Sequence, residues 1–194
     1  MLSLAITDAL LCACAAWLAS RADNLLGMRL ACGLLAIPAL LGVLRFSGLY
    51  PLLQWHQLFS ILSASAALPL LALSVLWPKS VVAQQKRYAL IFLAGAMLLG
   101  LLISGLGKLR IYDQALALLS MVVMLWVFAR QGARQATAGA ASMLLGSLLF
   151  VAKVNIAGLL QPGDFLHLGM AVGLVLVVRS CTDLQARPAA QIPA

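Results

Sequence analysis

Residues 161–178, QPGDFLHLGMAVGLVLVV, open with a proline and a glycine and continue as a long apolar run. Asp164, one of the five acidic residues of the chain, and His167, one of its two histidines, stand at the start of that run. A helix of roughly 20 apolar residues crosses the hydrocarbon core of a bilayer, and this run approaches that length. The stretch therefore predicts a membrane-spanning helix that begins beside a carboxylate and an imidazole.

The composition of the whole chain points to the same environment. Of its 194 residues 64% are hydrophobic and only 9% are charged, and the mean hydropathy is +1.06. A soluble domain is roughly half apolar and about a quarter charged. Lipid cannot satisfy free backbone groups, and the apolar runs lack the alternation of barrel strands, so the spans must be helices. The sequence predicts an all-α, polytopic membrane protein.

Seven apolar runs predict a single domain over residues 1–184, a bundle of seven transmembrane helices. The helices cover approximately residues 2–19, 28–46, 53–77, 88–106, 112–129, 136–156 and 165–181. We expect Pro38 to interrupt the second and Pro69 to kink the third. Small residues in the last two, Gly139-xx-Ser142-xxx-Gly146 and Gly169-xxx-Gly173, predict close helix contact. Residues 185–194, with two prolines and no apolar periodicity, predict a disordered cytoplasmic tail.

Lysine and arginine are distributed unevenly over the two sides of this bundle. Nine of the thirteen fall in the connections after the first, third and fifth helices or at the C-terminal end, and four fall on the other side. The positive-inside rule then places the C-terminus in the cytoplasm and the N-terminus outside, in a bacterial inner membrane. Basic residues beside anionic headgroups account for the net charge of +8, so we expect membrane lipids as partners and no nucleic acid.

Unusual polar residues gather at the outer ends of the predicted helices. Charged groups at membrane depth usually face a bundle interior or a wet cavity. The pattern therefore predicts an outward-facing polar pocket. Its candidate catalytic residues are His167, Asp164 and Asp8, and its candidate binding residues are Arg45, His56, Lys153, Asn155 and Ser60.

Each of these residues also has an ordinary structural interpretation. Asp164 is a typical N-cap, so it either caps the helix alone or also orients His167 as a general base or metal ligand. Asp8 either forms a buried ion pair with Lys153 or Arg45 or is a functional carboxylate. His56 is interpreted as a residue of the membrane interface, and Lys153 as a side chain that extends to the same interface. Arg45 either anchors its helix at the interface or binds a lipid phosphate, and Ser60 packs between helices.

Thr7-Asp8 in the first helix, and Asn155 followed by Asp164-Phe-Leu-His167 at the last, resemble motifs of the CREST superfamily of membrane hydrolases and receptors. That superfamily includes the alkaline ceramidases and the adiponectin-receptor type, and the chain resembles a small bacterial seven-helix branch near it. The resemblance implies a zinc-activated water that hydrolyses lipid amide bonds, with His167 as a last-helix ligand and Ser60 or Ser63 as the early-helix serine. The HxxxH pattern of the last helix is absent here.

Two functions follow from the sequence. In the first, the pocket binds a lipid headgroup or small anion, or the chain serves as a membrane partner or assembly component, which includes a homo-oligomer. In the alternative, the chain is a metal-dependent intramembrane lipid hydrolase. Only this alternative requires a zinc ion. Two histidines cannot supply a three-histidine site, so a carboxylate from Asp8, Asp113 or Asp164 would have to complete the ligand set.

Overall fold

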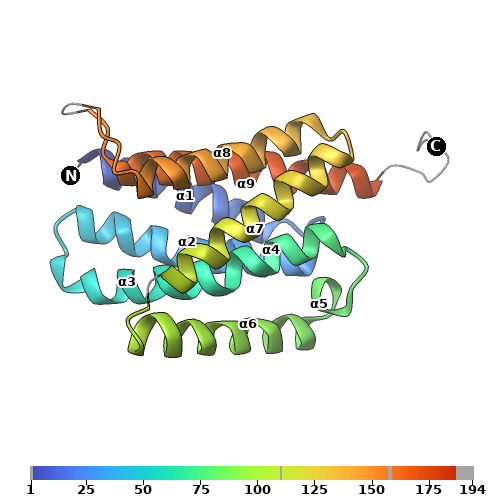
Figure 1. Ribbon diagram of the computed structural model, residues 1–194, viewed down its shortest axis with the longest axis horizontal. Helices are drawn as coiled ribbons and strands as arrows, with labels where there is room; N and C mark the ends of the chain where they lie inside the picture. Colours follow the sequence, from blue (N-terminus) through green and yellow to red (C-terminus); the bar gives the residue numbers. More distant parts are fainter. Residues whose placement is uncertain (1, 110, 157–158, 187–194) are drawn as a thin grey trace.

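The computed structural model describes residues 2–109, 111–156 and 159–186, and in these ranges the chain is almost entirely helical (Figure 1). Six helical segments are long and apolar enough to span a membrane. They are Leu2–Ser20, Leu26–Phe46, Tyr50–Leu76, Lys86–Leu106, Ile111–Arg130 and Pro162–Asp183. The fold is therefore that of a helical, multi-pass membrane protein.

The helices run along the long axis of the molecule, with α7 crossing diagonally (Figure 1). In chain order they are α1 (Leu2–Ser20), α2 (Leu26–Phe46), η1 (Tyr50–Leu52), α3 (Leu53–Leu62), η2 (Ser63–Ala67), α4 (Leu68–Leu76), α5 (Val81–Gln84), α6 (Lys86–Gly100), η3 (Leu101–Leu106), α7 (Ile111–Arg130), α8 (Arg134–Val151) and α9 (Pro162–Ala186). We call the end with the start of α1 and of α3 the proximal end, and the opposite one the distal end. The proximal end also holds the start of α9, and the distal end the connection from α1 to α2.

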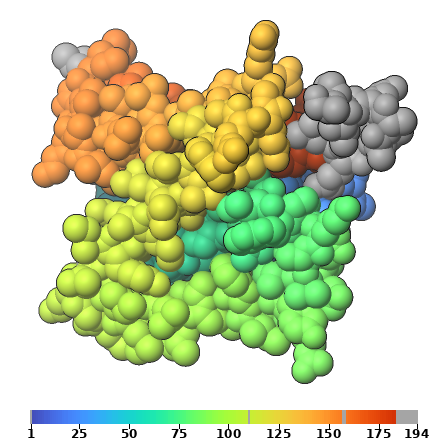
Figure 2. Space-filling model, turned by 45° about the vertical axis from the view of Figure 1, so that its right-hand side comes forward, coloured from blue at the N-terminus to red at the C-terminus, as the bar shows by residue number. Residues whose placement is uncertain are grey.

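The segment Lys86–Leu106 exposes apolar side chains that a water-soluble protein would bury. It is the most apolar of the six, yet only 22% of its apolar window is buried. Its surface lies along one edge of the molecule (Figure 2). The large apolar side chains exposed there include Leu90, Ile91, Leu98, Leu99, Leu102 and Leu106. A contiguous apolar surface of this kind favours contact with lipid.

α8 is not among the six apolar segments, because it begins with the polar pair Arg134-Gln135. It nevertheless packs closely along α9, and the predicted small-residue faces are confirmed as the contact. A Cβ atom on Gly146 would lie 2.5 Å from the carbonyl oxygen of Phe165, and one on Gly139 would lie 2.9 Å from that of Gly173. Glycine therefore lets the two backbones approach to a distance that any side chain would prevent.

Pro38 does not interrupt its helix as predicted, because α2 continues through it from Leu26 to Phe46. A proline has no N–H, so the carbonyl oxygen of Leu34, one turn earlier, loses its helical donor. The Ser63 hydroxyl donates to that oxygen over 2.9 Å. At Pro69 the preceding turn, η2, is a π-helix in which the Leu68 N–H bonds the Ser63 carbonyl five residues back. Such a wider turn is a recognised way for a helix to bend.

Two predicted helix boundaries were wrong by several residues at the connection from α8 to α9. α8 ends at Val151 rather than near residue 156, because Lys153 adopts a left-handed conformation with φ +54°. The Val154 N–H then bonds the Leu149 carbonyl over 3.0 Å, which closes the helix in a Schellman-type cap. α9 begins at Pro162, since proline suits the first helical position, and it continues to Ala186. The rest of the predicted tail, residues 187–194, lies outside the described residues.

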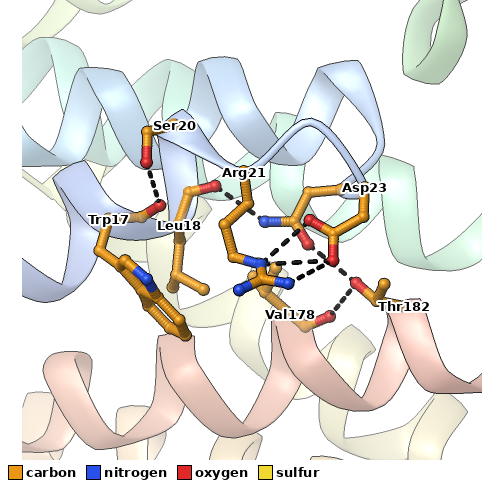
Figure 3. A network of polar contacts seen from close by, with 8 residues as sticks. Trp17, Leu18, Ser20, Arg21, Asp23, Val178 and Thr182 are labelled. Carbon is orange, nitrogen blue, oxygen red and sulfur yellow. Dashed lines mark hydrogen bonds and ion pairs between the residues drawn. The ribbon is translucent and has the colours of Figure 1, made fainter.

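At the distal end, the connection from α1 to α2 is attached to α9 (Figure 3). The buried Asn24 side chain donates to the Leu18 carbonyl over 2.8 Å and accepts from the Thr182 hydroxyl over 2.8 Å. Beside it, the exposed Arg21 and Asp23 form an ion pair. The hydrogen bond from Arg21 holds the pKa of the Asp23 carboxyl below its usual range. This attachment fixes α1 against α9 at one end.

Candidate functional site

The start of α9 is held by Asp164 acting from inside the helix. Asp164 is the third residue of α9, after Pro162 and Gly163, and its Oδ2 accepts the backbone N–H of Gln161 over 2.7 Å. This is the carboxylate half of a capping box, in which an acidic side chain reaches back to the residue before the helix. The prediction that Asp164 is the N-cap residue was therefore wrong, because the helix begins earlier than expected.

Asp164 has a second contact, which joins α9 to α1. Its Oδ1 accepts the Thr7 hydroxyl over 2.8 Å, and the Asp164 side chain is fully buried. Leu4 of α1 packs over Gly163, where a Cβ atom would lie 2.7 Å from the Leu4 Cδ2. Asp164 therefore both caps α9 and joins it to α1.

His167 lies one turn further along α9 and faces Thr7 and Asp8 of α1. Its Nδ1 is 3.3 Å from the Thr7 hydroxyl, and its Nε2 is 3.3 Å from the Oδ1 of Asp8. We call Thr7, Asp8, Asp164 and His167 the proximal network. Its members come from both ends of the sequence and meet where α1 and α9 pack together.

The chemistry of the donors sets the direction of the hydrogen bonds in the proximal network. A carboxylate only accepts, so Thr7 gives its single proton to Asp164, the shorter of its two side-chain contacts. His167 Nδ1 must then carry a proton and donate to the Thr7 oxygen. Nε2 and the Oδ1 of Asp8 can share a hydrogen bond only if one of these two atoms carries a proton.

Asp8 is enclosed on its other side by α2. Its side chain is 1% exposed, and its Oδ2 has no hydrogen-bond partner among the described residues. A Cβ atom on Gly42 would overlap Oδ2 and would lie 2.6 Å from the Asp8 Cγ, so only glycine allows α2 to pass here. Within the described part of the chain, Asp8 pairs with His167 and not with Arg45 or Lys153, the ion-pair partners that the sequence suggested.

A second polar pair, Arg45 with His56, lies next to this network. Arg45 follows Gly42 by three residues and so shares its face of α2. Its Nη1 is 3.2 Å from the Nδ1 of His56 on α3, and its guanidinium lies 4.7 Å from the Phe46 ring centroid. Arginine has no acceptor, so Nδ1 of His56 must accept and the proton of a neutral ring sits on Nε2. Ser60 donates to the His56 carbonyl over 2.7 Å, a bond to the preceding turn of its own helix.

Two predicted pocket residues do not join either group. Lys153 and Asn155 are exposed on the connection from α8 to α9, and neither forms a side-chain hydrogen bond or ion pair with any described residue. The turn at Lys153 ends α8 before these side chains reach the bundle. Thr7 and Gly42, by contrast, were not predicted as site residues. The only signal for Thr7 was its position next to Asp8.

The donor set of the proximal network does not suit the zinc ion that the CREST resemblance implies. Within the described ranges, no group of three or more His, Cys, Asp or Glu side chains is placed to hold a metal ion. Both ring nitrogens of His167 face α1, and both oxygens of Asp164 accept protein donors. We therefore derive no step through a metal.

The fold and the site together define a helical, multi-pass membrane protein with a buried acid–histidine network at one end. Over residues 3–186 the chain matches the model of a family described as "Family of unknown function (DUF6962)", and it belongs to that family. No curated protein and no solved structure matches the chain. The resemblance to the CREST superfamily stays a prediction.

Proposed function

We propose that this protein spans a bacterial inner membrane seven times, with its N-terminus outside. We propose further that it binds an anionic oxygen group at the proximal end through Arg45 and His56. The group is the phosphate of a lipid headgroup or a small anion in solution. The chemistry that recognises the two is the same, and the experiment below separates them.

The close packing of α8 on α9 supports the seventh crossing. α8 has 18 residues, a length of about 27 Å at 1.5 Å per residue, which is close to the roughly 30 Å of a hydrocarbon core. Of the eleven Lys and Arg residues that the structure describes, eight lie on the distal side and three on the proximal side, and the positive-inside rule makes the distal side cytoplasmic.

We expect the topology to be visible in cysteine labelling of a variant without the four native cysteines. In intact cells, a membrane-impermeant maleimide should label Ser47→Cys and Asn155→Cys, which lie outside, and should spare Lys86→Cys. Permeabilised cells are the control, because all three positions are exposed and should then react. Labelling of Lys86→Cys in intact cells would overturn the orientation. Protection of Asn155→Cys together with labelling of Ser47→Cys would overturn the crossing by α8.

The observation that carries anion binding is the partner of Arg45. A buried or half-buried arginine normally meets a carboxylate, whereas here the guanidinium donates to a neutral imidazole. Among the described residues no acidic group lies within ion-pair distance of Arg45. Both oxygens of Asp164 accept from Thr7 and Gln161, and Asp8 contacts His167 through Oδ1 while its Oδ2 lies beyond ion-pair distance of Arg45. The charge of Arg45 and the free N–H of His56 are therefore available to one anionic oxygen group.

We expect Arg45→Gln to weaken anion binding by about tenfold or more, because a hydrogen bond to a charged group contributes about 1.5–3 kcal/mol. Isothermal titration of the protein in phosphatidylcholine nanodiscs with inorganic phosphate tests the small anion. Thermal stabilisation in nanodiscs with added phosphatidylglycerol tests the headgroup.

The matched control is Lys108→Gln, an exposed cation after η3 at the same end. It should leave both readouts unchanged. If Arg45→Gln loses the binding of phosphate, the site binds a small anion. If it loses the stabilisation by phosphatidylglycerol, the site binds a lipid headgroup. If Arg45→Gln and Lys108→Gln behave alike in both, Arg45 does not bind an anion.

A further inference from the structure

A groove between α2 and α6, near the distal end, is separate from the proximal site. Its volume is about 390 Å³, within the range of roughly 300–1,000 Å³ in which small-molecule sites fall. Apolar side chains line it, including Leu30 and Ile37 of α2 and Leu93 and Met97 of α6. Arg29 is the single charged residue in the lining.

The length of the groove matches one leaflet of a bilayer. Its lining on α2 runs from Leu26 to Ile37, a distance of eleven helical steps, which is about 16 Å at 1.5 Å per step. Half of the roughly 30 Å hydrocarbon core is about 15 Å. The groove therefore extends from the distal interface to about the middle of the membrane, which is the depth that one acyl chain occupies.

Arg29 stands near the distal end of the groove, at the level of the headgroups. Its Nε donates to the Ala19 carbonyl at the end of α1 over 3.1 Å, which holds the side chain in place. The two terminal nitrogens have no acidic partner within ion-pair distance among the described residues. A guanidinium fork of this kind matches the oxygens of a phosphate. Lys86 and Arg87, exposed at the start of α6, add positive charge at the same end.

We propose that this groove binds an anionic phospholipid of the distal leaflet, with one acyl chain against α2 and α6 and the phosphate on Arg29. The charge at one end and the apolar lining along the rest have the polarity of a lipid. A transmembrane helix of a second copy would instead run the full depth of the bilayer, and the groove covers about half. The groove does not include Arg45, so its proposed ligand does not depend on the proximal site. If the proposed orientation holds, the distal leaflet is the cytoplasmic one.

Gly33 offers a way to fill the groove without disturbing the fold. It lines the groove, and a Cβ atom there would meet only the Ala19 Cβ, at 3.8 Å, an ordinary van der Waals contact. We expect Gly33→Leu to place its side chain where the acyl chain would lie. Gly95→Leu is the matched control, because a Cβ atom on Gly95 in α6 meets nothing within 4 Å and Gly95 does not line the groove.

The full-length protein is extracted from nanodiscs of phosphatidylglycerol and phosphatidylcholine in equal amounts, and native mass spectrometry counts the lipids retained. Wild type and Gly95→Leu should retain phosphatidylglycerol preferentially, and Gly33→Leu should retain about tenfold less. Arg29→Gln should lose the preference for phosphatidylglycerol, whereas Arg130→Gln, at the distal end of α7 over Trp126, should keep it.

Three results would overturn the proposal. Equal retention of phosphatidylglycerol by Gly33→Leu and Gly95→Leu would show that the lipid does not bind in the groove. An unchanged preference of Arg29→Gln for phosphatidylglycerol would show that Arg29 does not bind the headgroup. If Gly33→Leu does not fold, Arg29→Gln still tests the proposal. A dimer in the same spectra that Gly33→Leu dissociates would assign the groove to a second copy instead. If the proximal site also holds a phosphatidylglycerol, Arg45→Gln should remove that lipid, Gly33→Leu should remove a different one and the double variant should lose both, so failure here and failure at the proximal site are distinguishable.

Discussion

Replacing Gly169 by leucine separates α8 from α9 and lowers the free energy of unfolding by about 3 kcal/mol, the upper part of the usual range for overpacking. The added Cβ atom would lie 2.6 Å from the Ser142 carbonyl oxygen and 3.0 Å from the Gly146 Cα. Both are backbone atoms, which cannot turn aside as a flexible side chain does. The helices would have to move apart, and the contacts along the whole pair would weaken. Titration of the protein in mixed micelles with sodium dodecyl sulfate, followed by circular dichroism, measures the change.

The control for this substitution is again Gly95→Leu, which introduces the same side chain into a helix at a position with open space. It should change the free energy of unfolding by no more than about 0.5 kcal/mol, as exposed substitutions usually do. Similar losses in Gly169→Leu and Gly95→Leu would mean that the close approach of α8 and α9 does not contribute to stability.

Replacing Asp164 by alanine should lower the free energy of unfolding by about 2–4 kcal/mol. The change removes the acceptor of two donors at once, the Gln161 N–H and the Thr7 hydroxyl, and an unsatisfied buried donor costs about 1–3 kcal/mol. Asp164→Asn should cost less, because its amide oxygen can still accept one of the two bonds. The same micelle titration measures these effects. Asp183→Ala, an exposed carboxylate near the other end of α9, serves as the control and should be nearly neutral.

A double-mutant cycle with Thr7→Val separates the contact between α1 and α9 from the capping of α9. We expect a coupling free energy between Thr7 and Asp164 of about 0.6–1.7 kcal/mol, which lies between the average and the maximum measured for hydrogen bonds between membrane helices. Additive losses would show that Asp164 acts only as a cap. A coupling in this range would show that the proximal network joins the two ends of the chain.

The hydropathy and the glycine spacing of the chain were sufficient to predict much of the fold. The membrane class and the approximate extent of most helices follow from local composition, because the length of a span is set by the thickness of the bilayer. The contact of α8 with α9 follows from Gly139, Gly146, Gly169 and Gly173, since close approach requires small residues at helical spacing. The stretch at residues 161–178 was correctly predicted to be apolar helix beside a polar site.

The candidate site was predicted only in part. Asp8, Asp164 and His167 do come together, because all three lie at the proximal end on two helices that pack side by side. The pairing of Arg45 with His56 was not expected, and Lys153 was expected to point inward. The direction of Lys153 depends on a single backbone conformation that ends α8, and lysine is an unusual residue for it.

The sequence by itself determined that the chain is a bundle of membrane helices with its polar residues at their ends, because hydropathy and the cost of burying a charge act residue by residue. Only the tertiary structure decided which of those residues meet. Thr7 and Asp164 are separated by 157 positions, and their hydrogen bond exists because α1 and α9 pack against each other. Contacts of this kind depend on the faces that two helices turn toward each other, and no property of either segment alone specifies them.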